Sequence, residues 1–155
     1  MKLAIVGATG MVGKEMLEVL SERNFQLKEL IPVASETSSG KTINYLGKEY
    51  EIISLNHLIA RKVDLALFSA GGKISKEWAP KAAKETIVID NSSYFRMQND
   101  VPLVVPEVNP AALNKHKNII ANPNCSTMQM VLALKPLHDE YKIKRVIVST
   151  YQAVS

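Results

Sequence analysis

The residues best suited to take part in a reaction are 122–127, Asn-Pro-Asn-Cys-Ser-Thr, because Cys125 among them is the only cysteine of the chain. Ser126 and Thr127 are both preferred N-cap residues, so we expect the thiol where a helix begins. Free amide groups and the helix dipole favour the thiolate there, which is the nucleophilic form of cysteine. A buried cysteine that serves only as a small apolar side chain is the alternative, and the polar neighbours on both sides argue against it.

A second chemical feature is the glycine-rich segment 7–13, which has the spacing G-x-x-G-x-x-G. Residues 2–6 before it predict a short buried strand, and apolar residues at helical spacing predict a helix that runs to about Arg23. A glycine turn between a strand and a helix lets the backbone approach a pyrophosphate, which the helix N-terminus also attracts. Tight packing of strand against helix is the alternative use of these glycines.

Residues 30–34 predict the second strand, and a polar tip, residues 35–41, follows it. In a dinucleotide-binding domain this tip meets the adenosine ribose. An acid such as Glu36 suits the free 2′-hydroxyl of NAD, whereas the hydroxyls of residues 37–39 with Lys41 suit the 2′-phosphate of NADP. The tip carries both signals, and a plain polar loop is the third interpretation.

Two further strand ends carry candidate ligand groups. Residues 64–68 predict a strand that ends in the small residues 69–72, which leave room for a ligand or serve packing alone. Residues 86–90 predict another strand, and the polar turn after it leads to Arg96. Arginine grips phosphate or carboxylate groups in a planar fork, so Arg96 is a candidate anion ligand, with a surface ion pair as the alternative.

The remaining elements must position these groups. Their predicted ranges are a hairpin over 42–46 and 49–53, a helix over 74–84 interrupted by Pro80, a short helix over 110–115, a strand over 118–121, a helix over 128–134 that ends near Pro136, and a strand over 145–151. Strands that alternate with helices predict an α/β fold with a doubly wound, mostly parallel Rossmann-type sheet and a small hairpin insertion.

Composition excludes several classes of protein. A single cysteine rules out an internal disulfide and fits a reducing, cytoplasmic setting. The apolar run at the N-terminus is too short for a membrane span or a signal peptide, and the net charge of +4 is scattered rather than gathered on a nucleic-acid-binding face. The three histidines, His57, His116 and His138, fall in polar stretches and have no metal-ligand spacing, so we predict no metal site.

Six segments resemble aspartate-semialdehyde dehydrogenase in family order: residues 7–13, 68–71, 90–96, 104–109, 122–127 and 149–155. The resemblance implies an NADPH-dependent conversion of L-4-aspartyl phosphate to L-aspartate 4-semialdehyde with release of phosphate, a step of lysine, methionine and threonine synthesis. It implies that Cys125 carries the acyl group, that Asn124 shapes the pocket, that Gln152 holds the reacting carbonyl, and that Arg96, with Gln152, binds the substrate and its phosphate. The cofactor-binding residues that it implies are Gly7, Thr9, Gly10, Met11, Val12, Gly13, Ser35, Thr37, Ser38, Ser69, Ala70, Gly71 and Asn91.

This chain departs from the family in two ways. Many relatives carry arginine where this chain has Thr37, which weakens the grip on a 2′-phosphate, so NADP is implied with NAD as an alternative. The family's catalytic histidine and its carboxylate-binding arginine fall after Ser155. The resemblance therefore implies a dinucleotide-binding domain over 1–124 and only the beginning of a catalytic and dimerisation domain over 125–155. We expect this chain alone to bind nucleotide weakly and to turn over little substrate.

The implied complete enzyme is a homodimer or homotetramer whose partners are a small-molecule substrate and phosphate, without nucleic acid or membrane. Two other functions stay open. One is that of the related N-acetyl-glutamyl-phosphate reductase of arginine synthesis, against which residues 94–96 and Tyr151-Gln152 argue. The other is an isolated, non-catalytic dinucleotide-binding module, against which an intact Cys125 and an intact Gln152 argue.

Overall fold

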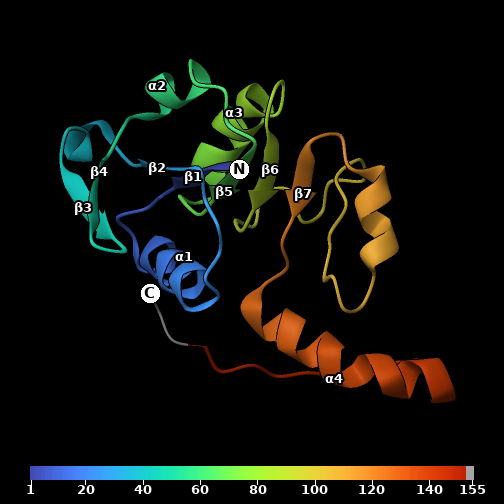
Figure 1. Ribbon diagram of the computed structural model, residues 1–155. Helices are drawn as coiled ribbons and strands as arrows, with labels where there is room; N and C mark the ends of the chain where they lie inside the picture. Colours follow the sequence, from blue (N-terminus) through green and yellow to red (C-terminus); the bar gives the residue numbers. More distant parts are fainter. Residues whose placement is uncertain (153–155) are drawn as a thin grey trace.

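A computed structural model describes residues 1–152 and contains one five-stranded parallel sheet with helices on both faces (Figure 1). The strand order is β2-β1-β5-β6-β7, and the strands pair without a register break. Their bounds are β1 Lys2–Val6, β2 Glu29–Val33, β5 Leu65–Phe68, β6 Ile87–Asp90 and β7 Ile119–Ala121. The predicted doubly wound α/β fold is confirmed, with strand ends that differ from the prediction by at most one residue.

Alternation along the strands assigns each apolar side chain to one of two cores. Leu3 and Ile5 of β1 face helix α1 (Met11–Glu22), where they meet Leu17. The intervening residues, such as Val6, face helices α2 (Leu55–Ile59) and α3 (Gly72–Ala82) on the other side. Because β1 is buried on both faces, its continuous apolar sequence is that of a central parallel strand.

The order of the strands places an opening beside β1. The chain passes from β1 to β2 on one side and then crosses to β5 on the other side. The connections after β1 and β5 therefore diverge at the carboxyl edge of the sheet, which is where open α/β folds bind ligands. The glycine-containing turns after β1 (residues 7–13) and after β5 (residues 69–72) both lie at this edge.

The predicted hairpin is also confirmed, with its turn at residues 46–47 rather than at 47–48 as predicted. Strands β3 (Thr42–Tyr45) and β4 (Lys48–Glu51) pair antiparallel across Leu46 and Gly47, whose φ angles are 51° and 76°. Two successive positive φ angles are typical of a type I′ turn, which matches the twist of paired strands. The hairpin adds Tyr45 to the core beneath α1.

Two predicted helix interruptions are wrong. Helix α3 continues through Pro80 to Ala82, and helix α4 (Cys125–Tyr141) continues through Pro136. Proline removes one amide donor and leaves the carbonyl four residues earlier without its partner. Pro80 and Pro136 lie on exposed parts of their helices, as do the residues four positions before them, so water can satisfy those carbonyls.

The segment after α4 also differs from its prediction. Residues 145–151 are not a strand: they pair with no other segment of residues 1–152, and Ile147 and Tyr151 are 85% and 99% exposed. Helix α4 buries no residue either, and in Figure 1 it extends away from the sheet. An apolar, β-branched run forms a strand only beside a partner with free backbone groups.

Between β6 and β7 the predicted short helix is present as a 3₁₀-helix over Pro110–Lys115.

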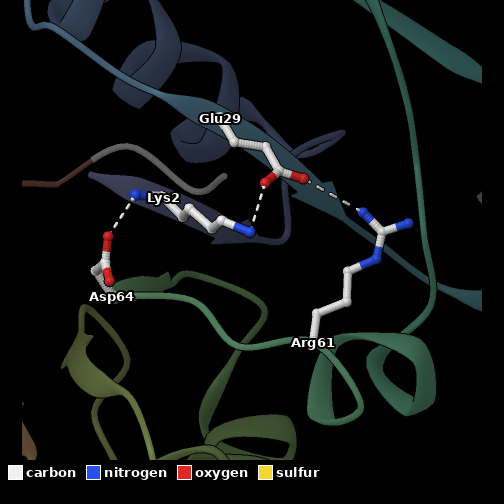
Figure 2. A network of polar contacts seen from close by, with 4 residues as sticks. All are labelled: Lys2, Glu29, Arg61 and Asp64. Carbon is white, nitrogen blue, oxygen red and sulfur yellow. Dashed lines mark hydrogen bonds and ion pairs between the residues drawn. The ribbon is translucent and has the colours of Figure 1, made fainter.

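A polar network closes the opposite, amino-terminal edge of the sheet (Figure 2). The Lys2 ammonium lies 3.1 Å from a Glu29 carboxylate oxygen, and the Arg61 guanidinium lies 3.7 Å from the other oxygen. The Lys2 amide donates to Asp64 at 2.7 Å. These groups are exposed, so their contribution to stability is small.

Among residues 1–152, no helix has the length and apolar character that crossing a bilayer requires.

Candidate active site

The glycine turn after β1 is shaped by close backbone contact. The amides of Gly7 and Ala8 both donate to the carbonyl of Val33 at the end of β2. Gly7 has a φ of +93°, and a Cβ atom there would lie 2.7 Å from the carbonyl oxygen of Ser69. A Cβ at Gly13, inside α1, would lie 2.2 Å from the Gly7 oxygen. Both positions therefore exclude any side chain, and Gly13 serves the packing of helix against turn.

A cleft of about 410 Å³ opens at the carboxyl edge of the sheet, beside this turn. It brings together predicted cofactor residues from three separate turns, after β1, β2 and β5. Those residues are Gly7, Thr9, Gly10, Ser35, Ser69 and Ala70. The sequence did not single out its apolar lining by Ala34, Leu55 and Ile74, because their proximity depends on the crossing of the chain.

Other predicted cofactor residues lie outside this cleft. Met11 and Val12 point into solvent, at 73% and 44% exposure, in the first turn of α1. Thr37, Ser38, Gly71 and Asn91 are also absent from its lining. Gly71 precedes α3 with a φ of +89°, which a residue with a side chain adopts only with strain.

The polar tip after β2 forms a 3₁₀ turn over Glu36–Ser38. The hydroxyl oxygens of Ser35 and Thr37 lie 2.8 Å apart, and that of Ser38 lies 3.5 Å from Ser35. The Asn56 side-chain amide donates a long hydrogen bond to the Glu36 carboxylate, with 3.5 Å between Nδ2 and Oε1. Lys41 lines a different groove, between α1 and the hairpin, and Ser35 is the one residue of the tip that lines the cleft.

Arg96 is half-buried and fixes two chain segments to each other. Its Nε donates to the carbonyl of Asn122 and its Nη2 to the carbonyl of Asn91, both at 3.0 Å. The side chain of Asn122 also donates to the Asn91 side chain at 2.7 Å. Arg96 thus joins the turn after β6 to the segment that leads into Cys125, and these two bonds use two of the five guanidinium N–H donors.

Cys125 is exposed and is the first residue of α4. The N-cap is Asn124 rather than Ser126 or Thr127, because the Asn124 side chain accepts from the Ser126 amide at 3.0 Å. The expected thiol at a helix start is therefore confirmed, with the cap two residues before Ser126 and the helix starting at residue 125 rather than 128. The Gln152 side-chain amide lies 3.9 Å from the Cys125 sulfur. Asn124 and Gln152 also line a hollow of about 330 Å³ between α4 and the final extended segment.

The histidines lie elsewhere in the described chain. His57 pairs with Ser54 at 3.0 Å, and His116 accepts from the Asn118 amide at 3.1 Å. His138 lines an apolar groove beside the far half of α4. Within residues 1–152 no three potential metal ligands gather in one place.

The chain is similar to known proteins over nearly its whole length. The family described as "Semialdehyde dehydrogenase, NAD binding domain" matches residues 2–116. The aspartate-semialdehyde dehydrogenase of Aquifex aeolicus (strain VF5) is 62% identical over 158 residues, which cover 99% of this chain and 46% of the relative. The enzyme of Helicobacter pylori (strain ATCC 700392 / 26695) is 53% identical over 156 residues, which cover 99% and 45%.

A solved structure gives the same result. Aspartate semialdehyde dehydrogenase II of Vibrio cholerae, complexed with ASA, has a TM-score of 0.84 and 53% identity, covering 90% of this chain and 46% of that one. The chain spans about half the length of the curated relatives that it matches. On its matched dinucleotide-binding domain and the shared fold, the chain belongs to the semialdehyde dehydrogenase family and is similar to the aspartate-semialdehyde dehydrogenases within it.

Proposed function

We propose that this chain supplies the NADP-binding and nucleophile-bearing part of an enzyme that converts L-4-aspartyl phosphate to L-aspartate 4-semialdehyde. The observation that carries the proposal is the linkage of three groups. Cys125 begins a helix, Gln152 lies 3.9 Å from its sulfur, and Arg96 holds the carbonyl of Asn122, three residues before the thiol. A nucleophile, a carbonyl-binding amide and an anion-binding guanidinium are the groups that acyl transfer to phosphate requires.

The residues present fit a nicotinamide dinucleotide. The turn at Gly7 has no room for a Cβ, and it borders a 410 Å³ cleft at the edge where such cofactors bind. When bound, the cofactor accepts a hydride in the oxidative direction and donates one in the biosynthetic direction. We infer a preference for NADP because the hydroxyls of Ser35, Thr37 and Ser38 gather at the tip while Glu36 contacts Asn56.

Cys125 carries the acyl group in the proposed reaction. In the oxidative direction its sulfur adds to the aldehyde carbon, and loss of hydride from that carbon leaves a thioester. The start of α4 favours the thiolate before attack, and the Gln152 amide is near enough to donate to the carbonyl oxygen during it. Exposure of the thiol gives the substrate access.

Arg96 binds the phosphate in the second half of the reaction. A phosphate oxygen attacks the thioester carbon, the carbon–sulfur bond breaks, and the thiolate returns while aspartyl phosphate leaves. Two Arg96 nitrogens already donate to backbone carbonyls, which fixes the plane of the guanidinium before an anion arrives. In the biosynthetic direction the same steps run in reverse.

The 155-residue chain alone is expected to turn over little substrate. None of the three histidines lines the hollow beside Cys125 or the dinucleotide cleft, so the described residues offer no imidazole base there. The chain also spans less than half of the Aquifex relative. Normal steady-state turnover of aspartate semialdehyde, NADP and phosphate by the chain alone would contradict this expectation.

A chimaera tests the proposed function directly. The 155-residue chain replaces the matched segment of the Aquifex aeolicus relative, whose 62% identity favours a compatible interface with its remaining half. We expect NADPH formation from aspartate semialdehyde and phosphate, and at least tenfold less from N-acetylglutamate semialdehyde. Equal or reversed preference would favour the reductase of arginine synthesis.

Two variants separate the roles within the chimaera. Cys125→Ser is expected to abolish turnover while NADP still binds. Arg96→Lys keeps the charge but loses the planar fork, so the KM for phosphate should rise by roughly tenfold or more. A chimaera that binds NADP and forms no product from either semialdehyde would favour a non-catalytic binding module.

A further inference from the structure

Asp90, the last residue of β6, is a buried acid for which the reaction has no evident use. Its side chain is completely buried, and no lysine, arginine or histidine of residues 1–152 forms an ion pair with it. Burial of a carboxyl group is costly unless donors replace the lost water. The desolvation cost of the Asp90 carboxyl group must therefore be offset by hydrogen bonds within the protein.

Three donors satisfy the Asp90 side chain. The Ser75 hydroxyl donates to Oδ1 at 2.7 Å, the Ser92 amide donates to Oδ1 at 3.1 Å, and the Ser92 hydroxyl donates to Oδ2 at 2.6 Å. Ser75 and Ser92 are themselves buried. Hydrogen bonds to an acidic side chain in a dry site are short and strong, so the three residues form a stiff unit.

This unit joins two parts of the candidate site. Ser75 belongs to α3, the helix that begins directly after the turn lining the dinucleotide cleft. Ser92 belongs to the turn that carries Arg96, and its hydroxyl also accepts from the Tyr94 amide at 3.3 Å. Through Asp90, the cofactor-side helix and the phosphate-side turn are fixed to the same strand end.

The turn after β6 also positions the segment that leads to Cys125. Arg96 donates to the carbonyls of Asn91 and Asn122, and the Asn122 amide donates to the Asp90 carbonyl at 2.8 Å. A shift of the turn would therefore move the guanidinium relative to Asn122 and so relative to Cys125. Productive acyl transfer depends on such alignment to within a fraction of an ångström.

We propose that Asp90, with Ser75 and Ser92, is a positioning residue that sets the Arg96 guanidinium against the segment leading to Cys125. Asp90 itself lines neither the dinucleotide cleft nor the hollow beside Cys125. The proposal rests on the proposed function only for what Arg96 binds, since the hydrogen bond from Arg96 to Asn122 exists without any ligand.

Solvent exchange of the Arg96 Nε–H, followed by NMR on the ¹⁵N-labelled 155-residue chain, tests the proposal. Ser92→Ala and Asp90→Asn each remove donors or acceptors of the buried unit. We expect either variant to speed this exchange by roughly fivefold or more, as loss of one buried hydrogen bond would. Ser75→Ala, which leaves the turn untouched, should give a smaller increase.

Thr86→Val is the matched control. The Thr86 hydroxyl is also buried and donates to the Val63 carbonyl at 3.1 Å, but it lies beside the opposite end of β6. This variant should lower the unfolding free energy about as much as Ser92→Ala and leave Arg96 exchange within about twofold of the original chain. Unchanged exchange in Ser92→Ala and Asp90→Asn, or an equal increase in Thr86→Val, would overturn the proposal.

A second measurement keeps the two proposals apart. Inorganic phosphate should slow alkylation of Cys125 in the original chain and less so in Ser92→Ala. Absence of phosphate protection in the original chain would contradict the phosphate role of Arg96. The exchange comparison would still decide whether Asp90 positions that arginine.

Discussion

At the scale of single residues, the site depends on places where only a bare backbone fits. Gly7 combines a left-handed φ of +93° with a carbonyl 2.7 Å from where its Cβ would be. Gly47 in the hairpin turn has a similar φ of +76° but has no atom within 4 Å of that position. The two glycines therefore separate backbone strain from steric exclusion.

Gly7→Ala should destabilise the chain by roughly 2–4 kcal/mol, because left-handed strain adds to a clash with Ser69. It should also weaken NADPH binding to the chimaera by at least tenfold. Urea unfolding and fluorescence titration measure the two effects.

Gly47→Ala is its control and should cost about 1–2 kcal/mol from φ alone, with unchanged NADPH affinity. Equal losses of affinity in the two variants would show that the cleft does not depend on the close approach of the turns after β1 and β5.

The sequence predicts residue types at the site better than it predicts their partners. The thiol at a helix start, the glycine turn and the arginine after a strand were all readable from local pattern. The contacts of Arg96 with Asn122, and of Asp90 with Ser75, join residues 26 and 15 positions apart. Local pattern carries no information on such pairs, so the buried acid at Asp90 looked like an ordinary strand end.

At the scale of elements, helix α4 shows how tertiary context decides boundaries. Its start depends on one side-chain bond from Asn124, and its continuation past Pro136 depends on an exposed surface. The strand expected over 145–151 is absent because no neighbouring strand of residues 1–152 offers backbone partners. The hairpin, by contrast, was predictable from a glycine between two strand-like runs, although its turn lies at Leu46-Gly47, one residue before the predicted position.

Asn124→Ala should lower the stability of α4 by about 1 kcal/mol, since the Ser126 amide loses its acceptor. Faster hydrogen exchange of that amide would report the loss, and slower alkylation of Cys125 would report a weaker helix start. Asn124→Ser keeps an N-cap oxygen and should restore both measurements. Unchanged exchange in the alanine variant would contradict the assignment of Asn124 as the cap.

The hairpin buries the polar hydroxyl group of Tyr45. The Tyr45 hydroxyl is buried without a hydrogen-bond partner among the described residues, so Tyr45→Phe should raise the unfolding free energy by roughly 1 kcal/mol. Burial, and secondly the nearby Tyr50, raise the pKa of Tyr45 above its ordinary value of 10.0. A raised pKa in the folded state means that the unfolded chain loses its proton first, so stability falls as the pH rises past about 10.

Urea unfolding between pH 8 and pH 11 measures this effect. The alkaline loss of stability should be smaller in Tyr45→Phe than in the original chain. Tyr50→Phe, at a half-buried position that packs edge-on against Tyr45, is the control and should keep most of the alkaline loss. An alkaline limb of equal size in Tyr45→Phe would contradict the assignment to Tyr45.

At the scale of the whole molecule, strand order β2-β1-β5-β6-β7 explains why distant segments share one edge. The crossing between β1 and β5 opens the dinucleotide cleft, and β6 and β7 bring Arg96 beside the segment before Cys125. The ion pairs of Figure 2 lie at the other edge, which agrees with their absence from the cleft and the thiol hollow. The alternation of strands and helices in the sequence predicts the fold class. It does not predict that α4 extends away from the sheet.

Cys125 is proposed to carry the acyl group. The most direct measurement is intact-protein and peptide mass spectrometry of the chimaera, quenched in acid after mixing with aspartate semialdehyde and NADP without phosphate. We predict one aspartyl adduct, which is located on Cys125, is absent from Cys125→Ser and is removed when phosphate is added. An adduct on another residue, or NADPH formation by Cys125→Ser at the original rate, would contradict it.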